Sequence, residues 1–380
     1  MMDYLDLCSR CWLEVDISAI EHNLAAVKKE IKPQTELIAV VKANAYGLGL
    51  CEISHILWNN GVKCFAVACL DEAFALHENI PEARVLCMGE SVCGDIKKAI
   101  KSGVRLTAGS QEAIDFISES AGELRQTAYI HCKVDTGLHR IGLDPSIAAE
   151  KIRKCCENPF MQVEGIYTHL ALHSRQSDER QHSFFISVIE NLKKSGHVPA
   201  MIHMLDSIGL IRYPQWQYNA VRIGALLYGN PPKDYTGANN ILSPVRFVAR
   251  VIRIADVRKG EYIGYDDENR LPRDSKIATL SVGYADGYPR CFSNCGETEI
   301  RGKRTKNIGL ICMDQMMTDV TEIEDVCIGD EAVLLGDGIS LTEYASAGHL
   351  NRNECTAIIG QRVPRVYVRK KDDGTVAVMR

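Results

Sequence analysis

Charged and polar side chains follow several short apolar runs in the first 230 residues. Lys42 is one of them, placed after the run AVV (39–41) and before ANAYG (43–47). An amine at the end of a buried strand loses its hydration, which lowers its pKa and allows it to form a Schiff base with an aldehyde. The alternative is a lysine whose stem lies along apolar surface while its amine reaches solvent, the commoner fate of such a residue.

Later apolar runs end in a similar way. Their closing residues are Lys133, Arg140, His169, His203, Ser207, Arg222 and Gly224. Cations, a hydroxyl, glycine amides and a flat imidazole together suit an anionic aromatic ligand that carries a phosphate or a carboxylate. Each of these residues alone is also explained by an ion pair or a capped turn. That explanation does not account for so many polar residues at the ends of neighbouring strands.

The apolar runs have the order expected of a (β/α)8 barrel. Amphipathic helical patterns such as 17–31 and 177–195 lie between them. Buried parallel strands are apolar on both faces and each crossover is a helix, so residues 12–240 are predicted to form a closed barrel with reactive groups at the carboxyl ends of its strands. The predicted strands are 36–44, 63–69, 83–89, 104–109, 127–135, 162–170, 199–206 and 220–224.

The pattern changes after the Pro-Pro pair at 231–232. Residues 241–380 alternate apolar and polar positions between turns rich in Gly, Asp and Asn, with one helical pattern near 341–350. Such alternation is typical of strands with one buried face. We therefore predict a second, mostly antiparallel β domain over 241–380.

The composition indicates a folded protein and argues against nucleic acid as a partner. Of the 380 residues, 46% are hydrophobic and 24% are charged, and the formal net charge is -5 without a long basic run. No apolar stretch reaches the roughly 18 residues that span a bilayer, and MMDYLDLCSR lacks the features of a signal peptide. A cytoplasmic chain is therefore expected.

The fifteen cysteines are scattered without regular spacing. An odd number without a framework indicates buried thiols in a reducing compartment rather than disulfides. Cys8 and Cys11 could form half of a zinc site, but no second pair of matching spacing follows them. The sequence therefore predicts no metal site.

Seven blocks resemble motifs of the alanine racemase family and follow the same order over nearly the whole chain. They are AVVKANAYGLG (39–49), KVDTGLHRIG (133–142), YTHL (167–170), VRIGALLYG (221–229), VGYADGYPR (282–290), CMDQ (312–315) and RVPR (362–365). The first, fourth and fifth blocks are highly specific. The resemblance implies an enzyme that uses pyridoxal 5'-phosphate (PLP), with a (β/α)8 barrel, a C-terminal β domain joined by residues 1–11, and head-to-tail homodimers.

The resemblance also implies roles for individual residues. Lys42 would hold PLP and act as one catalytic base, and Tyr284 of the other subunit would be the opposing base. Arg222 would face the pyridine nitrogen with His203 behind it, while His169 would lie against the ring and support Tyr284. Two bases suit racemisation, which removes a proton from one face of Cα and returns it on the other.

Further residues would hold the two ends of the cofactor and substrate. The phosphate cradle would consist of Tyr46, Ser207, Gly224 and Ala225. The residues beside the cofactor oxygen and the substrate would be Lys133, Arg140, Met313 and Asp314, the last two from the partner subunit. Lys133 corresponds to a position that is often carbamylated in the family.

Two positions depart from the family pattern. Leu310 stands where the family commonly has an arginine, and Asn353 stands where it commonly has a tyrosine beside the substrate. An asparagine leaves more space and adds amide hydrogen-bonding groups. In this respect the chain resembles the serine/alanine racemases of vancomycin-resistance clusters, in which a cytoplasmic racemase domain follows membrane helices.

The sequence therefore predicts a PLP-dependent racemase that interconverts L- and D-serine and L- and D-alanine and supplies D-amino acids for peptidoglycan precursors. Three alternatives stay open. A plain alanine racemase requires only that Asn353 is a neutral change. A PLP-dependent decarboxylase of basic amino acids usually sets an acidic residue against the ring nitrogen, where this chain has Arg222. A single-domain PLP-carrier protein would leave the β domain and Tyr284 without a role.

Overall fold

The first domain is a closed barrel of eight parallel strands. In the computed structural model, which describes residues 8–91, 94–232, 235, 240–265, 267–370 and 376–378, each strand pairs with the next and the last pairs with the first. The strands are β2 (Glu36–Val40), β3 (Cys64–Val67), β4 (Arg84–Cys87), β5 (Arg105–Ala108), β6 (Ala128–Lys133), β7 (Met161–Tyr167), β8 (Met201–His203) and β9 (Ala220–Ile223). Each overlaps a run predicted from the sequence, so the predicted barrel is confirmed.

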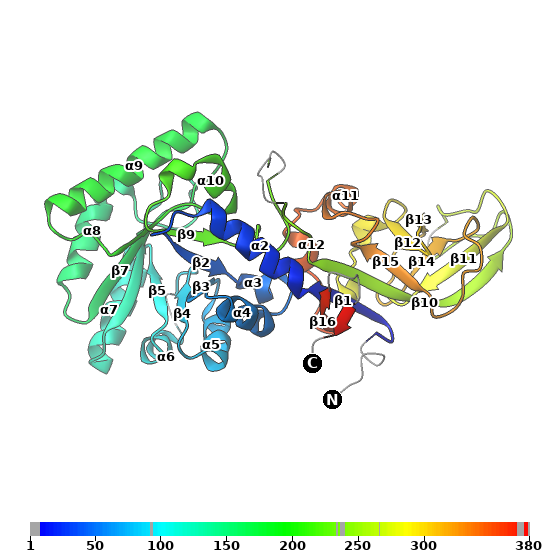
Figure 1. Cartoon of the computed structure of the whole chain (residues 1–380), viewed down its shortest axis with the longest axis horizontal. Coiled ribbons are helices and arrows are strands. Elements are labelled where there is room, and N and C mark those ends of the chain that lie inside the picture. The colour runs from blue at the N-terminus through cyan, green and yellow to red at the C-terminus, as the bar shows by residue number, and fades with distance from the viewer. Residues whose placement is uncertain are drawn as a thin grey trace.

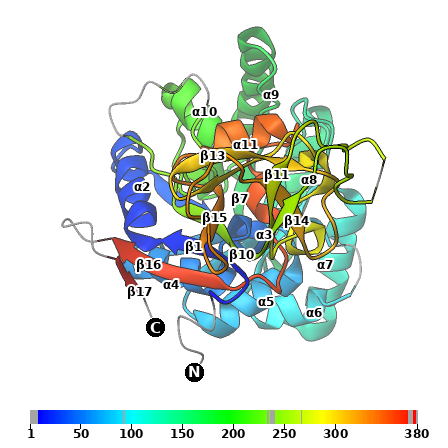
Figure 2. The same cartoon turned by 90° about the vertical axis from the view of Figure 1, so that its right-hand side faces the viewer.

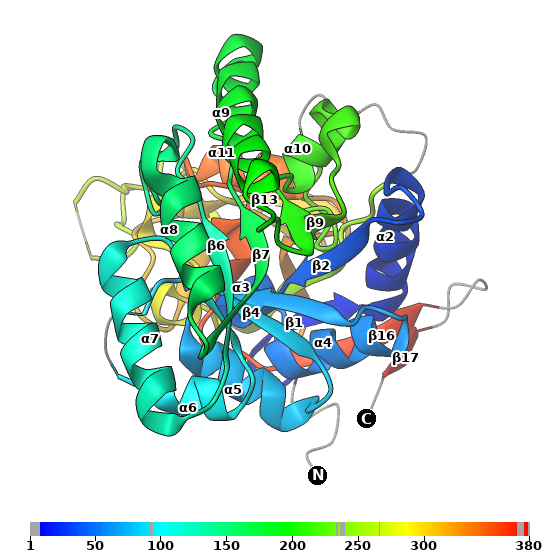
Figure 3. The same cartoon turned by 90° about the vertical axis from the view of Figure 1, so that its left-hand side faces the viewer.

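Helices surround the barrel and cover its strands, as Figure 3 shows. The first of them starts after Asp16, whose carboxylate accepts hydrogen bonds from the amides of Ser18 and Ala19. The helical elements of this domain are α2 (Ile17–Glu30), α3 (Lys42–Tyr46), α4 (Leu50–Asn59), α5 (Leu70–Asn79), α6 (Ile96–Lys101), α7 (Gln111–Leu124), α8 (Pro145–Glu157), α9 (Arg175–Lys194), α10 (Ser207–Arg212) and the 3-10 turn η1 (Pro214–Trp216). The helical patterns expected at 17–31 and 177–195 are thus present as α2 and α9.

The second domain is built on a nine-stranded, mostly antiparallel sheet that lies beside the barrel (Figures 1 and 2). Its order is β11-β14-β13-β12-β15-β10-β1-β16-β17, and β10 also pairs with β11. The strands that follow the barrel are β10 (Val245–Val257), β11 (Ser275–Leu280), β12 (Glu297–Ile300), β13 (Lys303–Ile308), β14 (Met316–Asp319), β15 (Glu331–Leu335), β16 (Arg365–Lys370) and β17 (Val376–Val378). The predicted fold class is therefore confirmed for both domains.

The N-terminal strand belongs to this second sheet. β1 (Cys11–Asp16) pairs antiparallel with β10 and parallel with β16, and α2 then carries the chain into the barrel. β1 thus extends into the range 12–240 expected for the barrel. Of the segment 1–11 expected to join the β domain, residues 1–7 lie outside the described residues.

One short helix of the second domain lies against the barrel, beside the turn that follows β2. α12 (Glu354–Ala357) packs on α3, and a side chain at Gly47 would collide with the carbonyl oxygen of Thr356. The other helical elements are η2 (Tyr284–Asp286), η3 (Arg290–Phe292) and α11 (Leu341–Ala347), the last of which matches the pattern near 341–350. Among the helices that the structure describes, none combines the length and the apolar character needed to cross a bilayer.

Candidate active site

A cavity of about 320 Å³ opens at the carboxyl ends of the barrel strands. Its lining includes ten of the residues selected from the sequence, namely Lys42, Tyr46, Lys133, Arg140, His169, Ser207, Arg222, Gly224, Ala225 and Asn353. His203 lies behind Arg222 rather than in the wall. The structure therefore brings together most of the expected site, with side chains from both domains.

Lys42 begins a left-handed turn directly after β2. Residues 43–46 all have φ between 52° and 56°. This conformation costs roughly 1–2 kcal/mol per residue for L-amino acids. The Glu72 carboxylate holds the turn, because it accepts hydrogen bonds from the amide of Asn44 (3.2 Å) and from an amide at the end of β3 (2.9 Å). The turn brings Tyr46 into the same cavity as Lys42.

One side of the cavity is shaped for a small anion. The Ser207 hydroxyl accepts hydrogen bonds from the amides of Gly224 (3.3 Å) and Leu226 (3.2 Å), which leaves its own proton to donate. A Cβ at position 224 would lie 2.5 Å from the Tyr46 hydroxyl, so glycine is needed there. Two hydroxyl groups thus lie beside a space that can accept a phosphate.

Arg222 is buried among imidazole and carbonyl groups. Its guanidinium donates to Nδ1 of His203 (2.8 Å) and to the carbonyls of Thr168 (2.8 Å) and Met204 (3.2 Å). Because Nδ1 of His203 accepts, its Nε2 carries the proton and donates to Nδ1 of His131 at 2.8 Å. Burial lowers the pKa of His203 well below its ordinary value and that of His131 to about 3, so both rings are neutral. These contacts fix the guanidinium without cancelling its charge.

The cavity contains several cations that repel one another. Burial and then Arg140 lower the pKa of Lys42, and burial with Arg140 and Arg222 lowers the pKa of Lys133 to about 8. Burial and then Arg222 lower the pKa of His169 well below its ordinary value, which keeps this ring neutral. A bound anion would relieve the repulsion. The charge of the site therefore favours a ligand with a phosphate or carboxylate group.

Two polar residues of the cavity were missed by reasoning from strand ends. Asp206 lines it, and burial raises the pKa of this carboxyl, which accepts a backbone hydrogen bond at the start of α10. Tyr167 also lines it, with its ring stacked on His203 and its hydroxyl 2.8 Å from that of Thr107. Asp206 is the last residue of the predicted strand 199–206 and directly precedes Ser207, so the strand-end rule could have found it.

Tyr284, Met313 and Asp314 lie together on the second domain. The amides of Tyr284 and Ala285 donate to the carbonyls of Cys312 and Met313, each at 3.0 Å. Tyr284 is 41% exposed and Met313 is 53% exposed. The lining of the Lys42 cavity includes none of the three. Within one copy of the chain, Lys42 therefore lies in the barrel cavity and Tyr284 lies outside it, on the second domain.

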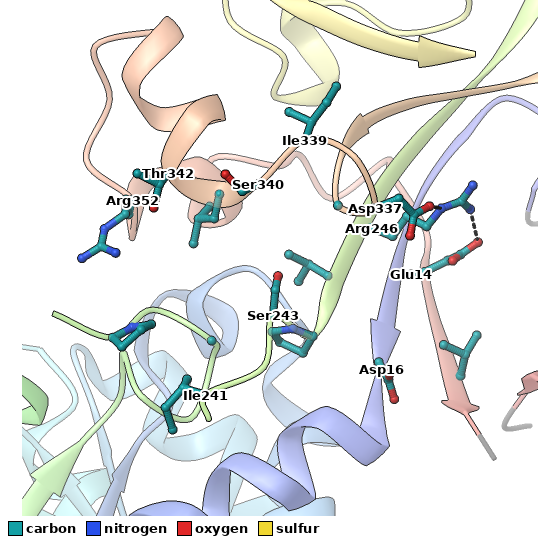
Figure 4. A pocket seen from close by; sticks show the side chains of 17 residues that line it. Glu14, Asp16, Ile241, Ser243, Arg246, Asp337, Ile339, Ser340, Thr342 and Arg352 are labelled. Atoms are coloured by element: carbon teal, nitrogen blue, oxygen red, sulfur yellow. Dashed lines mark hydrogen bonds and ion pairs between the residues drawn. The ribbon is translucent and has the colours of Figure 1, made fainter. Parts of the chain in front are cut away.

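A second cavity, of about 350 Å³, lies in the cleft between the domains (Figure 4). Arg246 on its wall forms ion pairs with Glu14 of β1, with Glu331 at the start of β15 and with Asp337 just after β15. None of the site residues expected from the sequence lines this cleft. We therefore assign it no part in the chemistry.

Both domains match models of one protein family. Residues 15–232 match the model described as alanine racemase, N-terminal domain, and residues 244–367 match the model described as alanine racemase, C-terminal domain. The chain belongs to the alanine racemase family. An alanine racemase of Clostridium tetani is 36% identical to it over 380 residues, with 97% of each chain covered.

Solved alanine racemases have the same fold. That of Clostridium difficile 630 gives a TM-score of 0.92 at 27% identity, with 97% of each chain covered. An alanine racemase of Bartonella henselae gives a TM-score of 0.84 at 27% identity, over 94% of this chain and 99% of that chain, and contains covalently bound pyridoxal phosphate. The expected resemblance to alanine racemases is therefore confirmed at the level of the family and the fold.

Asn353 is the position that suggested a serine/alanine racemase. It lines the Lys42 cavity of its own chain, and its side-chain oxygen accepts a hydrogen bond from the Asn230 amide at 2.5 Å. The relatives named above are alanine racemases. They favour the plain alanine racemase, which was an alternative, over the serine/alanine racemase of a vancomycin-resistance cluster.

Proposed function

We propose that this protein is an alanine racemase that uses PLP to interconvert L- and D-alanine. The observation that carries the proposal is the barrel cavity, in which Lys42 lies among Lys133, Arg140 and Arg222. A lysine of lowered pKa can bind the aldehyde of PLP, and the cations suit its phosphate and the carboxylate of an amino acid. Membership of the family and the PLP bound in the Bartonella henselae relative support the same assignment.

The residues of the cavity fit PLP at both ends. We assign its phosphate to Tyr46, Ser207, Gly224 and Ala225. The absence of a side chain at Gly224 supports this assignment, because a Cβ would fill the space beside the Tyr46 hydroxyl. Arg222 would face the ring nitrogen and donate to it, since a guanidinium does not give up its proton, and His169 would lie against the ring. When bound, PLP supplies an electron sink for the charge that forms as Cα loses its proton.

The proton is exchanged by two bases on opposite faces of Cα. Lys42 Nζ removes or returns it on one face, and Tyr284 Oη of a second copy does so on the other. Lys133 and Arg140 attract the substrate carboxylate and so hold Cα between the two bases. Each base serves as proton donor in one direction of the reaction and as acceptor in the other.

We propose that two copies of the chain complete each site, arranged head to tail. Tyr284, Met313 and Asp314 are exposed on the second domain, while Lys42 lies in the barrel. Placing the second domain of one copy at the barrel mouth of the other would join these groups, as the resemblance implies. Met313 and Asp314 would then reach the substrate beside Tyr284.

The test is to incubate the purified protein and PLP with L-alanine and to resolve the enantiomers. D-alanine should accumulate until the two enantiomers are equal. Lys42→Ala should abolish this activity, whereas Lys154→Ala, which removes an exposed lysine paired with Glu150, should leave it unchanged. A wild-type protein that binds PLP and forms no D-alanine would contradict the proposal.

Serine is a second candidate substrate, and the position of Asn353 favours it. The Asn353 amide lines the cavity, and the side-chain oxygen of Asn230 beside it is buried without a hydrogen-bond partner among the described residues. A polar pocket of this kind can bind the hydroxyl of serine, while its openness leaves alanine acceptable. We expect both amino acids to turn over. Their D-enantiomers would be available for peptidoglycan precursors, and the link to vancomycin-resistance racemases rests on Asn353 alone.

A further inference from the structure

Two turns of the second domain lie face to face, at 283–286 and at 312–315. The amides of Tyr284 and Ala285 in the first turn donate to carbonyls of the second, each at 3.0 Å. Gly283 permits this approach, because a Cβ there would collide with carbonyl oxygens of the second turn. The first turn carries Tyr284, so the contact between the two turns holds the backbone from which the phenol extends.

Arg362 joins the same two turns through its side chain. Its Nε donates to Oδ1 of Asp286 and its Nη2 donates to Oδ1 of Asp314, both at 2.7 Å. A planar guanidinium with donors in fixed directions can hold two carboxylates at once. Because Asp286 belongs to the first turn and Asp314 to the second, Arg362 fixes the distance between them.

Asp286 is the buried end of this bridge. Its side chain has no exposed surface, and its Oδ2 accepts a hydrogen bond from the amide of Gly283 at 2.9 Å, which closes the turn around Tyr284. Arg10 binds the same carboxylate, with Nη1 3.0 Å from Oδ2, and also donates to the carbonyl of Ser281. A buried carboxylate with this many donors has little freedom to move. A shift of the Arg362 guanidinium would therefore move Asp286 and, with it, the turn that carries Tyr284.

We propose that Arg362 is a positioning residue for Tyr284. It sets the Tyr284 turn against the turn that carries Asp314, and so directs Tyr284 Oη toward the substrate held by a second copy of the chain. This inference rests on the proposed function, because it takes Tyr284 as one of the two bases. Arg362 acts through Asp286 and Asp314 and takes no proton itself.

A double-mutant cycle in the PLP-loaded enzyme tests this role. With Tyr284 present, Arg362→Gln should lower kcat for L-alanine by about 10- to 100-fold and change KM by less than about threefold, as expected for a misplaced reacting group. In Tyr284→Phe the same substitution should lower the residual kcat by less than about threefold, because the group that it positions is gone. Equal losses in the two backgrounds, or an unchanged kcat in Arg362→Gln, would overturn the inference.

Two further variants separate positioning from folding. Arg362→Lys keeps the charge but reaches one carboxylate at a time, so it should recover part of the lost kcat. Arg301→Gln removes a different arginine–aspartate pair of the same domain, with Asp330, and should leave kcat unchanged. If thermal melting shows that Arg362→Gln does not fold, the cycle is run with Arg362→Lys, and additive losses there would again overturn the inference.

The same series distinguishes failure of this inference from failure of the proposed function. The wild type must racemise alanine and Tyr284→Phe must be impaired. When both conditions hold, additive losses in the cycle count against Arg362 alone. An inactive wild type, or a fully active Tyr284→Phe enzyme, would contradict the proposed function and this inference together.

Discussion

At the scale of single residues, Lys42 and Lys133 are two lysines of lowered pKa in one cavity. Only Lys42 starts the left-handed turn that also brings Tyr46 to the proposed phosphate site. We expect PLP on Lys42, so borohydride reduction followed by peptide mapping should recover the cofactor on the peptide that contains it. Label on Lys133 or on any other lysine would contradict the assignment.

Lys133 should give the site a pH dependence near 8. Because its pKa is lowered to about 8, it is a cation below that pH and neutral above it, and anions should bind more weakly as the pH rises. Propionate has the carboxylate of alanine without the amine and stays ionised throughout this range. Its inhibition constant should rise about tenfold between pH 7 and pH 9, as linkage to one proton requires.

Lys133→Arg is the matched control for this titration. An arginine stays protonated over the whole range, so the inhibition constant of propionate should then be nearly independent of pH. A wild-type inhibition constant that does not change between these pH values would show that Lys133 does not titrate in the site.

The proposed use of serine as a substrate depends on Asn353. Asn353→Tyr would fill the space and remove the amide, so kcat/KM for L-serine should fall far more than kcat/KM for L-alanine. An apolar pocket separates serine from alanine by a factor of about 10² at most, so the Asn353→Tyr enzyme should prefer alanine over serine by no more than this factor. Equal losses for both substrates would limit Asn353 to the fold or to phosphate binding.

At the scale of elements, the turn that follows β9 at Gly224 packs closely against the side chain of Tyr46. Gly224→Ala would place a Cβ 2.5 Å from the Tyr46 hydroxyl. The Tyr46 hydroxyl must then move away from the proposed phosphate site. A loss of about 1–3 kcal/mol in PLP binding corresponds to a dissociation constant about 5- to 150-fold higher. Gly122→Ala in α7 is the control, because its Cβ would meet only Phe160 at 3.9 Å. Equal PLP affinities of the wild type and Gly224→Ala, measured by fluorescence titration, would contradict the phosphate assignment.

The barrel and most of the residues at the carboxyl ends of its strands could be predicted, because each strand is recognised from a short stretch of sequence. Each strand is a short apolar run, and parallel strands of a closed barrel bring their carboxyl ends to one face, so Lys42, His169 and Arg222 could be placed together. The left-handed turn at 43–46 could not, because it depends on Glu72 and on packing against α12.

Long-range pairings left no signal in the sequence pattern. β1 pairs with β10 and β16, which lie more than two hundred residues away. The resemblance assigned only residues 1–11 to the second domain, whereas β1 runs from Cys11 to Asp16, inside the range 12–240 expected for the barrel. The contacts of Arg362 with Asp286 and Asp314 likewise join side chains that no periodicity relates.

At the scale of the whole molecule, the two domains separate the two proposed bases. Lys42 lies in the barrel cavity, and Tyr284 lies exposed on the second domain. A head-to-tail pair of chains would bring each Tyr284 to the cavity of the other copy and form two equivalent sites. The central claim is therefore that each active site uses Lys42 of one chain and Tyr284 of the other.

Co-expression of Lys42→Ala with Tyr284→Phe tests this claim most directly, with D-alanine formation from L-alanine measured on purified mixed dimers. Lys42→Ala alone should be inactive, and Tyr284→Phe alone should keep only a small residual activity. A mixed dimer holds one site with both bases intact, so it should show about half of the wild-type activity per dimer. Mixed dimers of confirmed composition that are as inactive as the single variants would contradict the account and place Tyr284 outside the shared site.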